Sequence, residues 1–233
     1  MLITALTKLT LLDFPDRLAC IIFTGGCNLR CGYCHNAEFV LPEKLRALSN
    51  TIPFETIKNF LYARQGKLDG VVICGGEPTI QPDLLEKIAE IKEMGFQVKV
   101  DTNGSRPTVI KKLIQSQLVD FWAMDIKDSL PYRKELLGVP VEETAIRESI
   151  QLIKDSGAEY EFRTTIFPNY HDLKTLQQIG HELSGAKKWA LQKGRSGKTL
   201  IQNFNNNNEY SESDLKTLQQ NLLPYATKVI YRT

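Results

Sequence analysis

The feature of this 233-residue chain that most constrains its fold is a regular alternation of apolar runs with amphipathic helical patterns. Several of the apolar runs are continuous, which is typical of parallel strands covered on both faces. The expected strands are Leu18–Thr24, Val71–Cys74, Phe96–Val100, Val119–Met124, Tyr160–Phe167, Lys188–Leu191 and Thr227–Tyr231. Because right-handed crossovers wind parallel strands into a barrel, this order predicts an α/β parallel barrel.

Helical segments separate these strands, and proline, serine or aspartate marks most of their starts. The expected starts are Pro53, Pro82, Pro107, a position near Val141, Asp172, and Ser211 paired with Asp214. Proline tolerates the first helical turn, and Asp or Ser side chains accept hydrogen bonds from its free N–H groups. About six strand–helix units fall short of the eight of a complete barrel. We therefore expect an incomplete, partly open (β/α)6-type barrel that forms one domain over residues 1–233.

Composition and charge narrow the function classes. The chain has 29 Lys and Arg against 27 Asp and Glu, and this net charge of +2 is too small to indicate attraction to nucleic acid or to a membrane. No apolar run approaches the ~18–20 residues that cross a bilayer, and residues 1–10 lack the pattern of a signal peptide. We therefore expect a cytoplasmic globular protein. The one low-complexity stretch, Gly194–Tyr210, predicts a solvated loop.

Polar or glycine-rich segments follow four consecutive predicted strands. They are Gly25–Cys34, Gly75–Pro78, Asp101–Gly104 and Asp125–Lys127. In parallel α/β folds the carboxyl ends of the strands meet at one rim, where ligands bind. The four segments therefore predict one composite site.

Three of the five cysteines stand in a C-x3-C-x2-C spacing, at Cys27, Cys31 and Cys34. Three thiolates can hold three irons of a [4Fe-4S] cluster and leave the fourth iron open to a ligand. The alternative is a structural zinc site with His35 as the fourth ligand, but zinc spacings usually pair two distant knuckles. The other two cysteines fall inside predicted strands, where a thiol acts as a small buried hydrophobe; they are Cys20 and Cys74.

These motifs resemble those of the radical S-adenosylmethionine superfamily. The resemblance rests on the cysteine triplet with Tyr33 before its third member, and on the segment Gly75–Pro78 after the next strand. Two further segments, Asp101–Gly104 and Met124–Lys127, resemble the glycyl-radical-enzyme activating enzymes. The segments Leu12–Asp16 and Arg163–Thr165 are most similar to the activating proteins of anaerobic ribonucleoside-triphosphate reductase.

The resemblance implies S-adenosylmethionine as cofactor, chelated by the open iron of a cluster on the three cysteines. It implies that the carbonyls of Gly75 and Gly76 meet the amino group of the cofactor; the alternative role for Glu77 is to orient the loop. Tyr33, Cys34 and His35 would lie along the adenosine, although ordinary packing also explains Tyr33. The residues expected at the cofactor are Tyr33, Cys34, His35, Gly75, Gly76, Glu77, Asp125, Ile126, Lys127, Arg163 and Gln192.

Two aspartates, Asp101 and Asp125, end neighbouring predicted strands, so we expect their carboxylates to converge. Carboxylates repel unless a cation intervenes. The resemblance implies a monovalent cation held by Asp101, Thr102, Asp125 and the backbone of Ala123. Lys127 offers a competing explanation, because it could neutralise Asp125 directly or bind the cofactor carboxylate. Arg163 is costly to bury unpaired, so it would face the cofactor, the partner or Asp125.

The sequence departs from the pyruvate formate-lyase activating enzymes at one position. Those enzymes place a histidine on a late strand against the ribose, whereas the matching region here places Gln192 there. The amide of Gln192 can replace the hydrogen bond of that histidine to the ribose, but it cannot ionise as an imidazole does. The departure favours a different glycyl-radical target.

The resemblance therefore implies an activase that cleaves S-adenosylmethionine reductively and generates a glycyl radical on anaerobic ribonucleoside-triphosphate reductase. Its electron donor would be a low-potential protein such as flavodoxin or ferredoxin. Alternatives are an activating enzyme of pyruvate formate-lyase or of another glycyl-radical enzyme, and a small-molecule radical enzyme. A non-catalytic electron carrier or zinc-binding module is the alternative from a different class, but it would need no glycine-rich rim. The loop Gly194–Tyr210 could also close the site around a small molecule.

Overall fold

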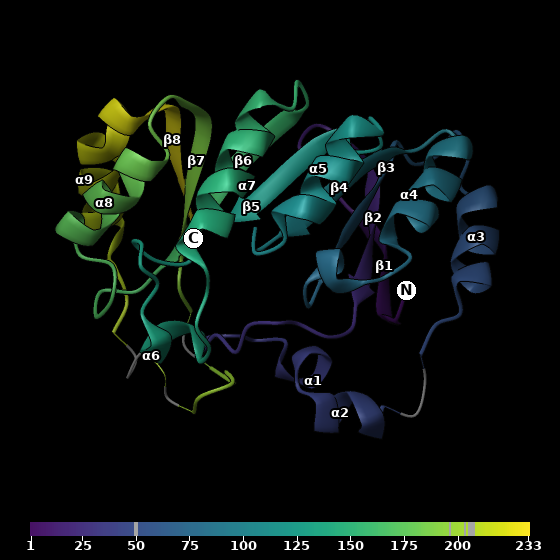
Figure 1. Cartoon of the computed structure of the whole chain (residues 1–233), viewed down its shortest axis with the longest axis horizontal. Helices are drawn as coiled ribbons and strands as arrows, with labels where there is room; N and C mark the ends of the chain where they lie inside the picture. Colours follow the sequence, from purple (N-terminus) through teal and green to yellow (C-terminus); the bar gives the residue numbers. More distant parts are fainter. Residues whose placement is uncertain (49–50, 196, 203, 205–207) are drawn as a thin grey trace. The chain divides into compact units, whose positions relative to one another are not determined.

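A computed structural model of the chain describes residues 1–48, 51–195, 197–202, 204 and 208–233 (Figure 1). The chain folds into two compact units, which we describe one at a time. Unit 1 comprises residues 1–28, 36–102 and 108–122, and unit 2 comprises residues 29–35, 103–107 and 123–233. The single-domain prediction stays a prediction. No helix of the described residues is long and apolar enough to cross a membrane.

All seven predicted strands are present, and the described part of the chain contains one further strand before them. The strands are β1 Ile3–Thr10, β2 Ala19–Thr24, β3 Gly70–Gly75, β4 Gln97–Thr102, β5 Phe121–Asp125, β6 Glu159–Ile166, β7 Ala186–Lys193 and β8 Ala226–Arg232. Their order in the sheet follows their order in the chain. The additional strand, β1, pairs antiparallel with β2. Its central residues are only partly buried, so its sequence lacks the continuous apolar run that identified the others.

The six predicted helices are also present, together with short helices that the sequence did not indicate. The predicted ones are α3 Phe54–Tyr62, α4 Leu84–Glu93, α5 Pro107–Gln115, α7 Glu143–Asp155, α8 Leu173–Glu182 and α9 Glu212–Leu222. The additional ones are α1 Ala37–Val40, α2 Pro42–Ala47, α6 Lys134–Leu137 and the 3-10 helices η1 Pro78–Ile80 and η2 Leu223–Tyr225. Helices of one or two turns are too short to show a 3.6-residue apolar period.

Side-chain caps confirm two of the expected helix starts. The carboxylate of Asp172 accepts a hydrogen bond from the N–H of Thr175 (2.8 Å) at the start of α8. Ser211 and Asp214 form a reciprocal capping box at the start of α9. These bonds satisfy N–H groups that the first helical turn leaves without intrahelical partners.

Unit 1 is built on the parallel strands β2, β3 and β4, with β1 on the outer side of β2. The middle residues of these strands are almost fully buried, as expected for strands covered on both faces. One exception to the apolar core is Lys99 on β4, which is 1% exposed. Its ammonium group pairs with the carboxylate of Asp101, two residues further along the same strand.

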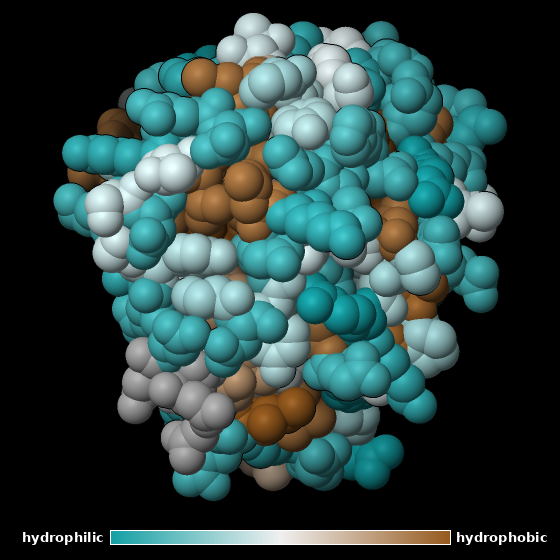
Figure 2. Space-filling model, turned by 90° about the vertical axis from the view of Figure 1, so that its left-hand side faces the viewer, coloured by the Kyte–Doolittle hydropathy of each residue, from teal (hydrophilic) through white to brown (hydrophobic). Residues whose placement is uncertain are grey.

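Unit 2 contains the parallel strands β6, β7 and β8, whose two faces differ in polarity. One face is apolar and includes Phe162, Trp189 and Val229, which are aligned on neighbouring strands and buried. The opposite face carries charged pairs, among them Glu161 with Lys188. In the space-filling view of Figure 2, hydrophilic side chains cover most of the visible surface, and hydrophobic ones lie between them in separate patches.

Glu161 on β6 is 2% exposed and bonds to both Lys188 (2.8 Å) and Arg232 (2.8 Å). Burial alone would raise the pKa of this carboxyl, but the hydrogen bonds from Arg232 and Lys188 outweigh burial and lower it from 4.5 to about 2. A carboxylate with a depressed folded-state pKa stabilises the fold above its unfolded pKa, and this contribution is lost as the pH falls toward the folded pKa.

We therefore expect a pH-dependent effect of Glu161→Gln on stability. The difference in unfolding free energy between wild type and Glu161→Gln should shrink by about 2 kcal/mol between pH 6 and pH 3. Urea titrations at several pH values measure it. Glu159→Gln, on the same strand and exposed, serves as the control with no such trend. A difference for Glu161→Gln that does not change with pH would contradict the assignment.

Candidate active site

The loop Gly75–Pro78 after β3 is fastened to the start of the cysteine-bearing loop within unit 1. The N–H of Glu77 donates to the carbonyl of Gly26 (2.8 Å), and the N–H of Gly76 donates to the carbonyl of Thr24 (2.8 Å). A Cβ atom on Gly76 would lie 1.8 Å from the oxygen of Gly26, so only glycine fits this close approach. The Gly-Gly pair therefore lies against the backbone that leads directly into Cys27.

The carboxylate of Glu77 is 1% exposed and holds its own loop in place. It accepts hydrogen bonds from the N–H of Thr79 (3.0 Å) and from the hydroxyl of Thr102 (2.8 Å) at the end of β4. Glu77 thus joins the carboxyl ends of two neighbouring strands. This geometry agrees with the alternative that Glu77 orients the loop.

The cysteine loop continues into unit 2, where the short helix α6 supports it. The N–H groups of Arg30 and Gly32 donate to the carbonyls of Leu137 (2.9 Å) and Leu136 (3.0 Å). Within the loop, the N–H of Cys34 donates to the carbonyl of Cys31 (3.0 Å) and closes a tight turn. The sequence contained no signal for α6, because a single helical turn shows no period.

All five cysteines are free thiols, as a bound cluster requires. Cys31 is buried, and burial raises the pKa of its thiol, with the charge of Lys127 partly offsetting this effect. Cys27 and Cys34 are half-buried. Cys20 lies in the core of β2, where burial raises its pKa to about 12, while Cys74 on β3 is half-buried. Among the described residues, no three His, Cys, Asp or Glu side chains are already gathered around a metal position.

The donor set of the loop fits an iron–sulfur cluster better than it fits zinc. Thiolates are the usual cluster ligands, and Cys27, Cys31 and Cys34 are three free thiols within one short loop. His35, the fourth ligand that zinc would need, is exposed, and its Nδ1 lies 3.2 Å from the carbonyl oxygen of Lys198. A hydrogen bond there leaves the imidazole turned toward the 194–210 segment.

Tyr33 is buried in an aromatic cluster of unit 2. Its ring lies 5.1 Å from that of Phe167 and 5.7 Å from that of Phe204, measured between centroids. Its hydroxyl is buried and finds no hydrogen-bond partner among the described residues. These contacts support the packing explanation for Tyr33, and its position along the adenosine stays a prediction.

Asp125, at the end of β5, is held between two cations. Its Oδ1 accepts a hydrogen bond from Nε of Arg163 (2.7 Å), and its Oδ2 accepts one from Nζ of Lys127 (2.8 Å). Burial alone would raise the pKa of Asp125, but the two positive charges outweigh burial and hold it well below its usual value. The N–H of Ile126 donates to the carbonyl of Arg163 (2.8 Å) and fixes the two strand ends together. The ion pairs expected of Lys127 and Arg163 are therefore present.

The same ion pairs weaken the argument for a monovalent cation. That argument needed two carboxylates without neutralising partners. Asp125 already has Arg163 and Lys127, and Asp101 has Lys99. A monovalent cation at Asp101, Thr102 and Asp125 stays a prediction. The two carboxylates do not need it for neutralisation, because each already has a cationic side chain as partner.

His171 is a site-supporting residue that sequence reasoning did not identify. It is fully buried, and burial lowers the pKa of its imidazole. Its Nδ1 accepts a hydrogen bond from the N–H of Phe167 (3.2 Å), so its Nε2–H donates to the carbonyl of Lys127 (3.0 Å). A neutral His171 thus fixes the backbone of the residue that pairs with Asp125. No motif around His171 distinguishes it in the sequence.

Removal of the negative charge of Asp125 should destabilise unit 2. Asp125→Asn removes the carboxylate that the cations Arg163 and Lys127 share, which we expect to cost about 3 kcal/mol and to lower the melting temperature by about 6–12 °C. Thermal unfolding of the variant measures this. The exposed pair of Arg147 and Glu143 supplies the control, because Glu143→Gln should change stability by less than about 0.5 kcal/mol. Equal melting temperatures for both variants would contradict the assignment.

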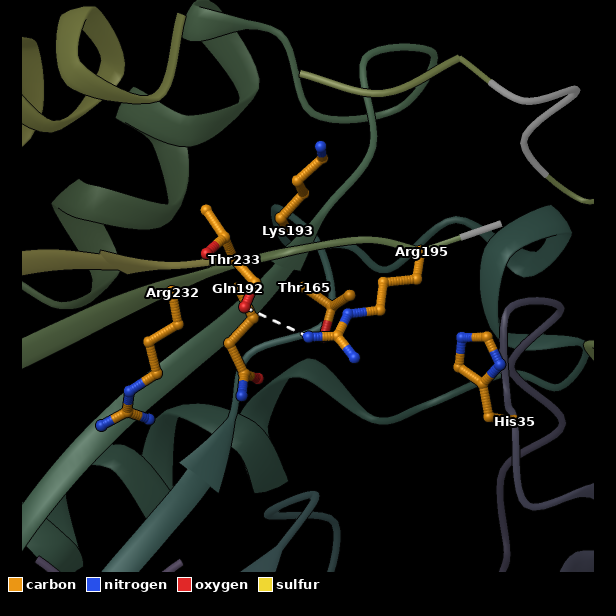
Figure 3. Close-up of a pocket in the computed structure, with 7 residues that line it drawn as sticks. All are labelled: His35, Thr165, Gln192, Lys193, Arg195, Arg232 and Thr233. Carbon is orange, nitrogen blue, oxygen red and sulfur yellow. Dashed lines mark hydrogen bonds between the residues drawn. The ribbon is translucent and has the colours of Figure 1, made fainter. Parts of the chain in front are cut away.

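A pocket of about 220 Å³ opens at the carboxyl ends of the strands of unit 2 (Figure 3). Its lining residues are His35, Thr165, Gln192, Lys193, Arg195, Arg232 and Thr233. The pocket brings together His35 and Gln192, both expected at the cofactor. The three basic residues of its wall were not anticipated. The sequence feature that could have indicated Arg232 is its place directly after the predicted strand Thr227–Tyr231.

Comparison with known proteins defines the class to which this fold and site belong. A family model of the Radical SAM superfamily matches residues 21–179. The chain is 33% identical over 237 residues to a Methanocaldococcus jannaschii protein named "putative glycyl-radical enzyme activating enzyme MJ1227", a match that covers 100% of this chain and 96% of that protein. The chain belongs to the radical S-adenosylmethionine superfamily.

Within that superfamily, the chain is homologous to glycyl-radical enzyme activating enzymes, and the match to the Methanocaldococcus jannaschii protein extends along its whole length. A shorter match joins it to the pyruvate formate-lyase-activating enzyme of Staphylococcus aureus, with 37% identity over 89 residues. That match covers 36% of this chain and 34% of that enzyme.

Solved structures confirm the α/β fold class. Streptococcus suis SuiB bound to the precursor peptide SuiA has a TM-score of 0.70 at 17% identity, over 91% of this chain and 48% of that one. Methylornithine synthase (PylB) has a TM-score of 0.64 at 15% identity, over 91% of this chain and 63% of that one. This chain therefore spans about half the length of SuiB and shares its fold.

Proposed function

We propose that this chain is an activating enzyme that generates a glycyl radical on an anaerobic ribonucleoside-triphosphate reductase. The observation that supports the activating-enzyme part of the proposal is the full-length similarity, with 33% identity, to a protein named a putative glycyl-radical enzyme activating enzyme. The reductase as target is supported by the segments Leu12–Asp16 and Arg163–Thr165. Its cofactors would be a [4Fe-4S] cluster and S-adenosylmethionine. A low-potential donor such as flavodoxin or ferredoxin would supply electrons in the cytoplasm.

In this proposal Cys27, Cys31 and Cys34 hold the cluster. The cluster, when bound, supplies the electron for reductive cleavage of the sulfonium. The turn between Cys31 and Cys34 and the support from α6 preorganise two of the ligands. Burial of Cys31 keeps water away from its sulfur.

The cofactor would be held by backbone and side-chain groups that the fold fixes in advance. The close approach of Gly76 to Gly26 supports a role for the Gly75–Gly76 backbone in binding the amino group. His35 and Gln192 line one pocket, which supports their place on the adenosine side. Lys127 and Arg163 orient Asp125 and bring positive charge to the end of β5, where a cofactor carboxylate can bind.

A second candidate is the activation of pyruvate formate-lyase. It is favoured by the 89-residue match to the Staphylococcus aureus enzyme. Gln192 argues against it, because it stands where those enzymes are expected to carry a histidine.

Isotope transfer from a labelled partner tests the proposal. The reconstituted protein is incubated anaerobically with S-adenosylmethionine, a reductant and a reductase deuterated at its radical glycine. We expect deuterium in 5′-deoxyadenosine and a glycyl radical by electron paramagnetic resonance. Labelled pyruvate formate-lyase is the matched comparison. Transfer from pyruvate formate-lyase alone would select the second candidate, and transfer from neither would contradict both.

A further inference from the structure

Lys99 is a charged residue in an otherwise apolar row on one face of the sheet of unit 1. Strands β2, β3 and β4 lie side by side (Figure 1), and Lys99 is aligned with Val72, which is aligned with Ile21. All three residues are buried, and Lys99 is 1% exposed. Burial of an ammonium group is costly unless an anion pairs with it. The row favours an aliphatic side chain at position 99, so the charge of Lys99 needs its own explanation.

The charge of Lys99 is directed toward the carboxyl end of β4. Lys99 and Asp101 are two residues apart on this strand, so their side chains lie on the same face. The ammonium group donates a hydrogen bond to Oδ1 of Asp101 and lies 6.0 Å from the ring centroid of Phe121. The face of an aromatic ring also attracts a cation. Lys99 thus holds a fixed positive charge next to the carboxylate at the end of the strand.

Asp101 lies beside the residues that fasten the proposed cofactor loop. The next residue, Thr102, donates its hydroxyl to the buried carboxylate of Glu77 (2.8 Å). Glu77 belongs to the loop Gly75–Pro78, whose backbone is proposed to bind the amino group of the cofactor. S-adenosylmethionine also carries a carboxylate, which an aspartate without a counter-charge at this rim would repel. A cation at Asp101 therefore favours cofactor binding.

The pair of Lys99 and Asp101 is poorly explained by stability alone. Replacement of a buried ion pair by well-packed apolar side chains is often neutral or stabilising. An ammonium group, however, has the same single charge as an alkali ion and donates up to three hydrogen bonds. Because Lys99 is tethered to β4, its place next to Asp101 does not depend on the ion concentration of the solution. These properties suit Lys99 to the role of a built-in counter-ion.

We propose that the ammonium group of Lys99 takes the place of the monovalent cation expected at Asp101, so that cofactor binding by this chain needs no alkali ion. Lys99 is a positioning residue in this proposal, because it acts on the cofactor through Asp101. The inference rests on the cofactors of the proposed function, and it does not depend on which glycyl-radical enzyme is the target.

Calorimetric titration of S-adenosylmethionine into the reconstituted protein, without reductant, tests this inference. The titrations are made in potassium chloride, sodium chloride and tetramethylammonium chloride at equal concentration, since tetramethylammonium is too large for an alkali-ion site. The wild-type affinity should be the same in the three salts. Lys99→Met keeps a long side chain without its charge. It should bind the cofactor about tenfold more weakly in tetramethylammonium chloride, and potassium or sodium should restore most of this loss.

Two variants serve as controls. Lys92→Met removes another lysine of unit 1 that pairs with an aspartate, Asp120 (2.7 Å), but this lysine lies on α4. It should bind the cofactor as the wild type does in all three salts. Lys99→Met combined with Asp101→Asn removes both charges of the pair, so its affinity should not depend on the alkali ion.

Two titration results would overturn the inference. The first is a wild-type affinity that rises about tenfold when potassium or sodium replaces tetramethylammonium, because the site would then still need an alkali ion. This comparison uses no variant, so it decides the question even if Lys99→Met fails to fold. The second is an affinity of Lys99→Met that is unchanged, or that no alkali ion restores, because the role of Lys99 would then be structural.

Thermal unfolding of the reconstituted protein, before the cofactor is added, separates this inference from the proposed function. Relative to the wild type, Lys99→Met should melt about 3 °C higher in potassium chloride than in tetramethylammonium chloride, because the alkali ion binds the folded state. Such a shift would support the inference even if the reductase received no radical, in which case the proposed function alone would fail. The absence of this shift would overturn the inference.

Discussion

Replacement of Cys31 by alanine should abolish assembly of the four-iron cluster and lower S-adenosylmethionine cleavage by more than about a hundredfold. Two thiolates cannot hold the same cluster with one iron open. Cys27→Ala and Cys34→Ala should have the same effect. Iron and sulfide analysis, the visible spectrum and product formation under dithionite measure it.

Cys74→Ala is the matched control, because Cys74 is also a free, half-buried thiol but lies on β3 outside the triplet. It should keep a full cluster. A normal four-iron spectrum with retained cofactor cleavage in Cys31→Ala would refute the ligand assignment. Retention of stoichiometric zinc by the wild-type protein, with no iron bound, would favour the zinc module.

Substitution of alanine for Gly76 should lower S-adenosylmethionine cleavage by about a hundredfold. The new Cβ would stand 1.8 Å from the carbonyl oxygen of Gly26, so the loop must move by an ångström or more. Displacements of this size at a positioned group cost about that factor in rate. Because the contact involves backbone atoms, no side-chain rotation relieves it.

Gly66→Ala gives the comparison for this substitution. Gly66 has a positive φ of 68°, and a Cβ there meets nothing within 4 Å. Its variant should lose about 1 kcal/mol of stability and keep cofactor cleavage. Calorimetric titration of the cofactor, together with melting temperatures, separates the two effects. Wild-type cofactor affinity and turnover in Gly76→Ala would remove the loop from the binding site.

The sequence indicated correctly those strands and helices that have long apolar runs or strong caps. The seven predicted strands, β2 to β8, and the six longer helices are all present. Such segments carry several turns or a full buried run, so local pattern and tertiary burial agree. β1 and α6 were missed because each takes its stability from a neighbour: β1 pairs with β2, and α6 holds the cysteine loop.

For the site, too, the sequence indicated the local motifs correctly but not the contacts between distant segments. Cysteine spacing and the Gly-Gly-Glu-Pro segment identified a cluster loop and a cofactor loop, because both are short local motifs. The loop Gly194–Tyr210 was expected to be solvated, yet Leu200 and Ile201 bond to the cysteine loop. Its run Asn205–Asn208 lies mostly outside the described residues.

The sequence by itself therefore determined the class of chemistry, since the identities and spacings of Cys27, Cys31 and Cys34 are fixed along the chain. Only the tertiary structure decided how charge is distributed around that chemistry. The pairing of Asp125 with Arg163, the bridge from His171 to Lys127, and the basic pocket each join residues from separate strands or loops. Electrostatic energy depends on distance and burial, and neither quantity is encoded locally in the order of the residues.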